Sequence, residues 1–245
     1  MLCQLEVCLA SDQGPLADNC RIAAEHKVAS IELCAAMTVG GLTPSAKEIR
    51  VVRAYSQAST RLMVMIRPRA GDFCYQPTEI KQMLLEIKQA ADNGADGVVF
   101  GCLTATGQLD HQAMQSLVHC SQQHKLAVTF HRAFDAGDAP ALLLGELLPY
   151  QPQRILTNGT RWHSGLGILQ GVTQLQWLQQ QDSKGVQWVF GGGLTPELLP
   201  TLQRQLQPAY WHFYSALLQQ HRLVPERLAQ VQQLLNQQKG LLEHE

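Results

Sequence analysis

Two short apolar runs of this sequence carry the same pair of side chains, a glutamate followed two positions later by a cysteine. The first run contains Glu6 and Cys8, and the second contains Glu32 and Cys34. Because side chains alternate between the two faces of a strand, each glutamate shares a face with its cysteine. Two reduced cysteines on neighbouring strands offer the soft sulfur ligands that Cu(I) prefers. The pattern predicts a Cu(I) site at Cys8 and Cys34, with small buried hydrophobic side chains as the alternative.

A third apolar run, residues 62–66, leads into a segment rich in charged side chains, with Arg67, Arg69 and Asp72 close together. The planar guanidinium group of arginine binds carboxylate and phosphate groups well. These residues are therefore candidates for holding an anion. The alternative is that the arginines pair with acidic neighbours within the protein.

His131 lies at the end of a fifth apolar run, on the same face as Thr129. Histidine commonly transfers protons near neutral pH, and a glutamate at the same depth would orient it. Together with Glu6, Glu32 and Arg67, His131 suggests acid–base catalysis on a small anionic substrate. A neutralised charge network that only fills the protein interior is the alternative.

Three consecutive glycines, Gly191, Gly192 and Gly193, follow the seventh apolar run. Backbone amides in glycine-rich loops approach phosphate groups closely, and many α/β barrels bind phosphate after strands seven and eight. We expect an anion site here. The alternative is a sharp turn into a helix that begins near Pro196.

The elements that would position these residues alternate regularly along the chain. Eight apolar runs, each followed by a helical pattern, predict a closed (β/α)8 TIM barrel, in which the carboxyl ends of the strands line the functional face. The expected strands cover residues 5–9, 29–34, 62–67, 97–103, 127–132, 154–157, 187–190 and 209–214. The expected helices cover residues 15–26, 45–57, 77–93, 110–124, 139–148, 166–181, 196–205 and 225–237.

Composition narrows the class of protein further. The 245 residues are 45% hydrophobic, and no linker-like tract divides them, so we expect one domain over residues 1–245. A net charge of -1 argues against nucleic acid or an anionic membrane as the main partner. The sequence contains neither a signal-peptide pattern nor an apolar run of about 18 residues, which predicts a cytoplasmic protein. The seven cysteines form no CxxC motif, so we expect reduced thiols.

Several longer motifs occur in a characteristic order: EVC, IELCAAMTVGGLTPS, VMIRPRAGDFCY, DGVVFGCLTATGQLD, VTFHRAFD, RILTNG and the triple glycine. Together they resemble the copper homeostasis protein family CutC across roughly residues 5–215. The resemblance implies a cytoplasmic (β/α)8 barrel, commonly a homodimer, that handles copper through cysteines. By position, the resemblance implies that Cys8 and Cys34 lie at the family's cysteine-containing strand ends. It also implies that the polar mouth of the barrel contains Arg67, Arg69, Asp72 and His131.

Two functions follow from these observations, and a non-catalytic barrel that works by binding a partner is a third alternative. The first is copper homeostasis through Cu(I) bound at Cys8 and Cys34. The second is a barrel enzyme that acts on a small anionic substrate, such as a phosphorylated molecule, with His131 as acid or base. In the second function Arg67 and Arg69 hold the anion, and Glu6 and Glu32 orient the histidine.

Overall fold

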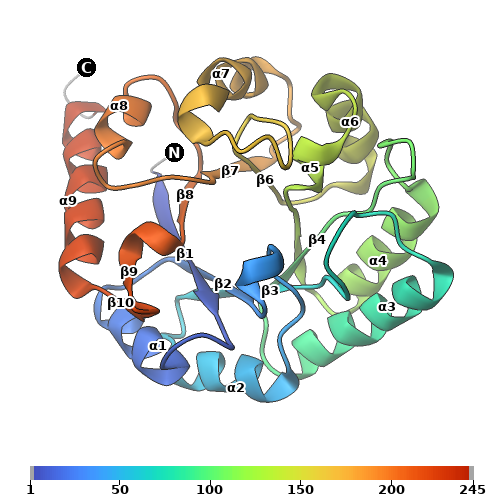
Figure 1. The fold of residues 1–245 in the computed structure, drawn as a ribbon, viewed down its shortest axis with the longest axis horizontal. Coiled ribbons are helices and arrows are strands. Elements are labelled where there is room, and N and C mark those ends of the chain that lie inside the picture. Colours follow the sequence, from blue (N-terminus) through green and yellow to red (C-terminus); the bar gives the residue numbers. More distant parts are fainter. Residues whose placement is uncertain (1–2, 243–245) are drawn as a thin grey trace.

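Eight parallel strands form a closed barrel in chain order, β1 to β8 (Figure 1). The computed structural model describes residues 3–242, so residues 1–2 and 243–245 of the expected domain lie outside the described part. The strands are β1 (Gln4–Ala10), β2 (Ser30–Cys34), β3 (Arg61–Met65), β4 (Gly97–Phe100), β5 (Ala127–Phe130), β6 (Arg154–Thr157), β7 (Gln187–Gly191) and β8 (Tyr210–Phe213). Pairing of β1 with β8 closes the ring, which confirms the predicted TIM barrel.

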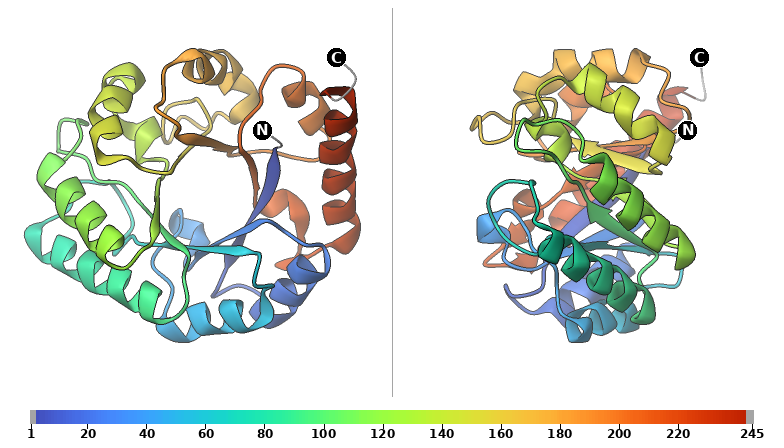
Figure 2. Two further views of the ribbon diagram at one scale, coloured as in Figure 1. Left: turned by 180° about the vertical axis from the view of Figure 1, so that it is seen from behind. Right: turned by 90° about the vertical axis from the view of Figure 1, so that its right-hand side faces the viewer.

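Helices surround the barrel on its outside (Figures 1 and 2). Local sequence sets several of their starts: Ser45 and Glu48 form a capping box at the second helix, and Pro77 opens the third. The helices are α1 (Leu16–Glu25), α2 (Ala46–Tyr55), α3 (Pro77–Asp92), α4 (His111–Gln123), α5 (Ala133–Ala136), α6 (Pro140–Leu147), α7 (Val172–Gln180), α8 (Leu199–Gln203) and α9 (Pro225–Leu242).

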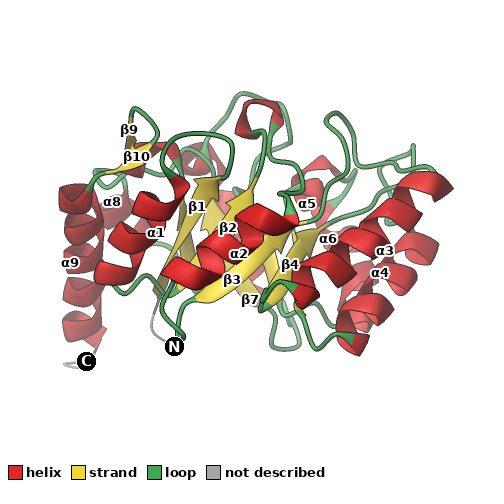
Figure 3. Ribbon diagram, turned by 90° about the horizontal axis from the view of Figure 1, so that it is seen from below, coloured by secondary structure: helices red, strands yellow, loops and turns green. Residues whose placement is uncertain are grey.

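Smaller elements that the sequence did not predict join these helices and strands. They are four 3-10 turns, η1 (Met37–Val39), η2 (Leu148–Tyr150), η3 (Ile168–Gly171) and η4 (Ser215–Leu217), and the antiparallel pair β9 (Leu218–Gln219) and β10 (Arg222–Leu223). The pair β9 and β10 lies at the end of the barrel opposite the start of β1 and the end of α9 (Figure 3). This end, where the strands reach their carboxyl termini, is called the mouth below.

The expected eighth strand, over residues 209–214, ends one residue early at Phe213, and three other strands end earlier by more than this. The expected strands over residues 62–67, 97–103 and 127–132 end at Met65, Phe100 and Phe130. At the first of these, the amide of Arg67 donates to Thr43 Oγ1 at 2.8 Å, so the chain leaves the strand ladder for the mouth loops. The expected helix over residues 196–205 is also shorter, because tight turns precede α8.

Apolar side chains fill both sides of the barrel wall. The main core lies between the strands and the outer helices. Inside the barrel, one small cluster contains Cys8, Cys34, Met63, Met65 and Val99, and another contains Leu156, Val189 and Tyr210. Within the described part of the chain, no helix combines the length and the apolar character that a membrane crossing requires.

Candidate functional site

A buried layer of polar side chains crosses the barrel interior on five strands. We call it the inner polar layer, and it consists of Glu6, Ser30, Thr129, Arg154 and His212. Glu6 Oε2 accepts a hydrogen bond from Ser30 Oγ at 2.6 Å, and Glu6 Oε1 lies 2.9 Å from His212 Nδ1. Arg154 Nε donates to Thr129 Oγ1 at 2.9 Å. The layer therefore links strands on opposite sides of the barrel.

The charge of Glu6 is balanced within this layer. Arg154 Nη2 lies 2.6 Å from Glu6 Oε2, an ion pair whose alignment is not that of a hydrogen bond. Burial acts to raise the pKa of Glu6, but Arg154, His212 and Ser30 outweigh burial and lower this pKa to about 2. Glu6 is thus a paired carboxylate at neutral pH. Arg154 was not among the predicted site residues, although a charged residue opening an apolar strand was a signal for it.

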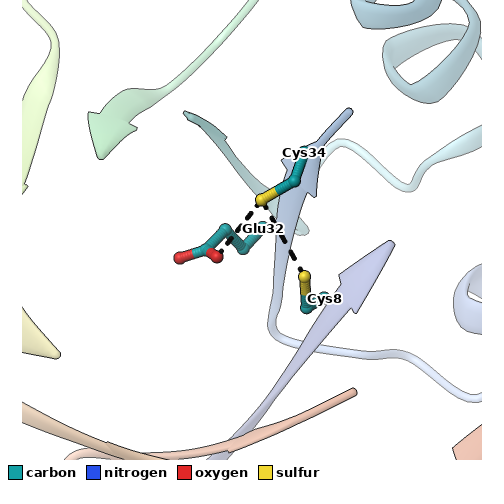
Figure 4. A group of neighbouring side chains, drawn as sticks. All are labelled: Cys8, Glu32 and Cys34. Carbon is teal, nitrogen blue, oxygen red and sulfur yellow. Dashed lines mark hydrogen bonds between the residues drawn. The ribbon is translucent and has the colours of Figure 1, made fainter. Parts of the chain in front are cut away.

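Towards the mouth, the two predicted cysteines come together. Cys8 Sγ lies 3.9 Å from Cys34 Sγ, and Cys34 Sγ lies 3.5 Å from Glu32 Oε1. Figure 4 shows the three side chains projecting from β1 and β2 towards one another. One ligand atom from each of these residues lies within 4.8 Å of the others, which is close enough for the three to share a metal ion.

The ionisation of the two thiols is unequal. The hydrogen bond with Cys34 lowers the pKa of Cys8, whereas the same bond and burial raise the pKa of Cys34 well above its ordinary value. Burial also raises the pKa of Glu32, and the nearby charge of Glu6 acts in the same direction. Because the thiolate is the metal ligand, Cys8 is the thiol that is better prepared to bind.

A third sulfur atom, which the sequence did not indicate, lies at this site. Met37 belongs to η1, the turn that follows β2, and its Sδ lies 3.9 Å from Cys8 Sγ. The cluster therefore offers two thiols and one thioether, with one carboxylate beside them.

The mouth contains a cavity of about 220 Å³, called the mouth cavity below. Four of its lining residues each have one buried polar atom without a hydrogen-bond partner, namely Glu32 Oε2, Arg67 Nε, His131 Nε2 and Trp162 Nε1. Buried polar groups in native proteins are nearly always hydrogen-bonded. Four exceptions around one cavity indicate a place for a polar ligand.

His131 is held in its neutral form. Its Nδ1 accepts a hydrogen bond from the amide of Ala133 at 3.1 Å, so the ring proton resides on Nε2. Burial, followed by the charges of Arg67 and Arg132, lowers its pKa to about 3. At neutral pH His131 is therefore a hydrogen-bond donor at Nε2.

Arg67 is buried, and its guanidinium group binds backbone carbonyls. Nη1 donates to the carbonyls of Val39 and Gly41 at 3.0 and 3.1 Å, and Nη2 donates to that of Gly71 at 2.8 Å. The group also lies over the ring of Phe73, 5.1 Å from its centroid. Arg67 thus joins two mouth loops and adds a positive charge to the wall of the mouth cavity.

Arg69 and Asp72 lie apart from this arrangement, and neither lines the mouth cavity. Arg69 Nη2 lies 2.8 Å from Asp72 Oδ1, and Arg69 Nε lies 2.6 Å from Glu79 Oε1. Arg69 therefore follows the alternative expectation, in which the arginines pair with acidic neighbours within the protein. Binding of an anion by Arg69 and Asp72 stays a prediction.

The triple glycine forms a sharp turn, which the sequence predicted as the alternative to an anion site. Gly191 ends β7, and Gly192 and Gly193 have φ values of +88° and +76°, which disfavour other residues. A Cβ atom at Gly191 would lie 2.8 Å from the carbonyl oxygen of His212. Gly192 and Gly193 line the mouth cavity, so phosphate binding by their amides stays a prediction.

A second, outer cavity of about 760 Å³ shares Arg67, Arg132 and Trp162 with the mouth cavity. Arg132 lies over the ring of Trp162, 4.8 Å from its centroid, and pairs with Asp135 at 2.7 Å. Asp135 is buried and also accepts a hydrogen bond from Thr157, so it anchors the arginine. Neither Arg132 nor Trp162 was among the predicted site residues: Arg132 was the last residue of the expected strand 127–132, which ends at Phe130, and Trp162 lies in a loop without a repeating pattern.

Solved structures share this architecture. The chain is similar to a putative copper homeostasis protein CutC from Streptococcus agalactiae, with a TM-score of 0.76 and 27% identity over 85% of this chain and 97% of that one. A thiamine phosphate pyrophosphorylase from Pyrococcus furiosus has a TM-score of 0.64 at 12% identity, over 96% of each chain, and shows the barrel fold alone.

Sequence comparisons point to one family. The CutC family model matches residues 3–213. A CutC family protein of Bacteroides thetaiotaomicron is 40% identical over 210 residues, which are 86% of this chain and 80% of the relative. Another, from Mesorhizobium japonicum, is 35% identical over 209 residues, which are 85% of this chain and 76% of the relative. The chain therefore belongs to the CutC family.

Proposed function

We propose that this protein acts in copper homeostasis by binding Cu(I) through Cys8 and Cys34. The proposal rests mainly on the 3.9 Å separation of the two sulfur atoms. Two sulfurs bound at about 2.3 Å, the length of a zinc–sulfur bond, lie about 3.8 Å apart at tetrahedral angles and about 4.0 Å apart at trigonal angles. The pair therefore matches a shared metal ion without movement of the backbone.

The surroundings of the thiols support a soft, singly charged ion. Both cysteines are fully buried and pack against Met63, Met65 and Val99, and burial raises the pKa of Glu32, the one carboxylate beside them. Thiolate and thioether sulfur favour Cu(I) over harder ions. The site needs both thiols reduced, a state that the cytoplasm maintains.

A competition titration of the reduced protein with Cu(I), against a chelator of known affinity, tests this proposal. We expect one tight site per chain that is lost in the variant with Cys8→Ser and Cys34→Ser. The matched control carries Cys20→Ser and Cys102→Ser, because these thiols are also fully buried but lie in the outer core. Equal Cu(I) affinity in all three proteins would overturn the proposal.

The unpartnered atoms around the mouth cavity favour a second candidate function, which we propose as binding and acid–base turnover of a small anionic molecule. The charge of Arg67 and the Nε2 proton of His131 suit an acceptor oxygen of such a ligand. Glu32, whose pKa burial raises, is the better group to transfer a proton. His131 then serves as the hydrogen-bond donor.

Calorimetric titration with inorganic phosphate, followed by a panel of phosphorylated and carboxylated metabolites, tests the second candidate. We expect His131→Phe to abolish binding of an active ligand, because the ring keeps its volume but loses Nε2. The Cys8→Ser and Cys34→Ser variant should retain that binding. A ligand bound equally by wild type and His131→Phe would exclude this role for the mouth cavity.

A further inference from the structure

Met37 occupies an unusual position for a residue in a surface turn. Its Sδ lies 3.9 Å from Cys8 Sγ, the same separation as that between the two cysteine sulfurs. It packs against the inner apolar cluster of Cys8 and Cys34 and also lines the mouth cavity. Met37 therefore lies between the thiol pair and the mouth.

The backbone around Met37 is held in a strained conformation. Ala36 has a φ of +48°, which is unfavourable for a residue with a Cβ atom. Its amide donates to Asp12 Oδ1 at 2.9 Å, and Arg67 donates to the carbonyls of Val39 and Gly41 further along the turn. Such strain persists only where the surroundings hold it, and it is concentrated at functional positions.

Gly41 keeps a shared space open for two sulfur atoms. It has a φ of +86°, and a Cβ atom built on it would lie 3.3 Å from both Cys34 Sγ and Met37 Sδ. The two sulfurs thus approach the same point from different elements. Each also lies 3.9 Å from Cys8 Sγ, so an ion bound at Cys8 has both sulfurs as neighbours.

We propose that Met37 Sδ is a third ligand, which completes a three-sulfur Cu(I) site with Cys8 and Cys34. This inference rests on the proposed function. A thioether is soft and uncharged, so it adds affinity for Cu(I) without adding negative charge to a site that already contains two thiols. It binds the ion from the mouth side, where the flexible methionine side chain can move aside for entry and release.

Met37→Leu tests the inference, because leucine keeps most of the volume and removes the sulfur. The matched control is Met65→Leu, whose residue belongs to the same cluster and lines the same cavity. In the Cu(I) competition titration we expect Met37→Leu to keep one site per chain but to lose at least about tenfold in affinity, equivalent to about 1.4 kcal/mol. Met65→Leu should resemble the wild type.

X-ray absorption at the copper edge gives a measurement that does not depend on a variant. In protein labelled with selenomethionine, we expect the Cu(I) ion to show two sulfur neighbours and one selenium neighbour. Two sulfur neighbours without selenium, together with unchanged affinity in Met37→Leu, would overturn the third ligand while leaving the cysteine site intact. A wild-type protein that binds no Cu(I) would instead refute the proposed function, and this inference with it.

Discussion

The inner polar layer and the mouth cavity both contain glutamate, arginine and histidine, but they differ in how these groups are partnered. In the inner polar layer, Glu6 contacts Arg154, His212 and Ser30 within 2.9 Å. At the mouth, Glu32 and His131 each keep a buried polar atom without a partner. The first arrangement joins strands across the barrel, whereas the second leaves bonding capacity for a ligand. Composition alone does not separate a structural cluster from a functional one, but the pairing of charged groups does: Glu6 has Arg154 as its counter-charge, whereas Glu32 has no ion-pair partner in the described part of the chain.

The largest expected effect comes from removing the charge of Glu6. Glu6→Gln leaves Arg154 buried without its counter-charge, and breaking a buried pair in this way costs about 3–5 kcal/mol of unfolding free energy. Urea unfolding at pH 7 measures this loss. A loss below about 1 kcal/mol would show that the inner polar layer is not the main electrostatic support of the barrel.

A smaller effect is expected from the buried neutral His131. Its pKa is about 3 in the folded protein and about 6.5 when unfolded, so the unfolded chain binds the extra proton between these values. The contribution of His131 to the free energy of unfolding therefore has its full value above pH 6.5 and decreases as the pH falls. Relative to His131→Gln, the wild type should lose about 2 kcal/mol of unfolding free energy between pH 6.5 and pH 5.

Urea unfolding of both proteins across this pH range measures that difference. The inner polar layer is present in both proteins, so the titration of Glu6 and of His212, whose pKa is raised well above its ordinary value, cancels from the difference. Parallel curves for wild type and His131→Gln would show that His131 has the same pKa in the folded and unfolded states, and so is not held neutral by the fold.

The smallest effect on stability is expected at Glu32. Burial raises its pKa, and Oε2 has no partner in the described part of the chain, so Glu32→Gln removes little that holds the fold together. We expect a change of about 1 kcal/mol or less in the free energy of unfolding. The same urea measurement, made beside Glu6→Gln, compares the two regions directly. Equal losses of unfolding free energy at both positions would show that the inner polar layer and the mouth cavity do not differ in their contribution to stability.

Local sequence determined much of this protein. The alternation of apolar runs and helical segments predicted the barrel, because strand and helix periodicity are local properties. The two-residue repeat also placed Cys8 and Cys34 on the same face of adjacent strands, but the register, which pairs Cys8 with Glu32 and Ala10 with Cys34, was not predictable from parity. Strand ends were less predictable, because they depend on bonds to distant loops such as that from Arg67 to Thr43.

Tertiary structure alone decided which polar groups meet. Arg154 reaches Glu6 across the barrel because of strand stagger, which no single segment encodes. Met37 joins the cysteines through the left-handed backbone at Ala36, and Trp162 reaches the mouth cavity from an irregular loop. Periodicity places a side chain on a face of its own strand, but only the packed barrel determines its partner on the opposite side.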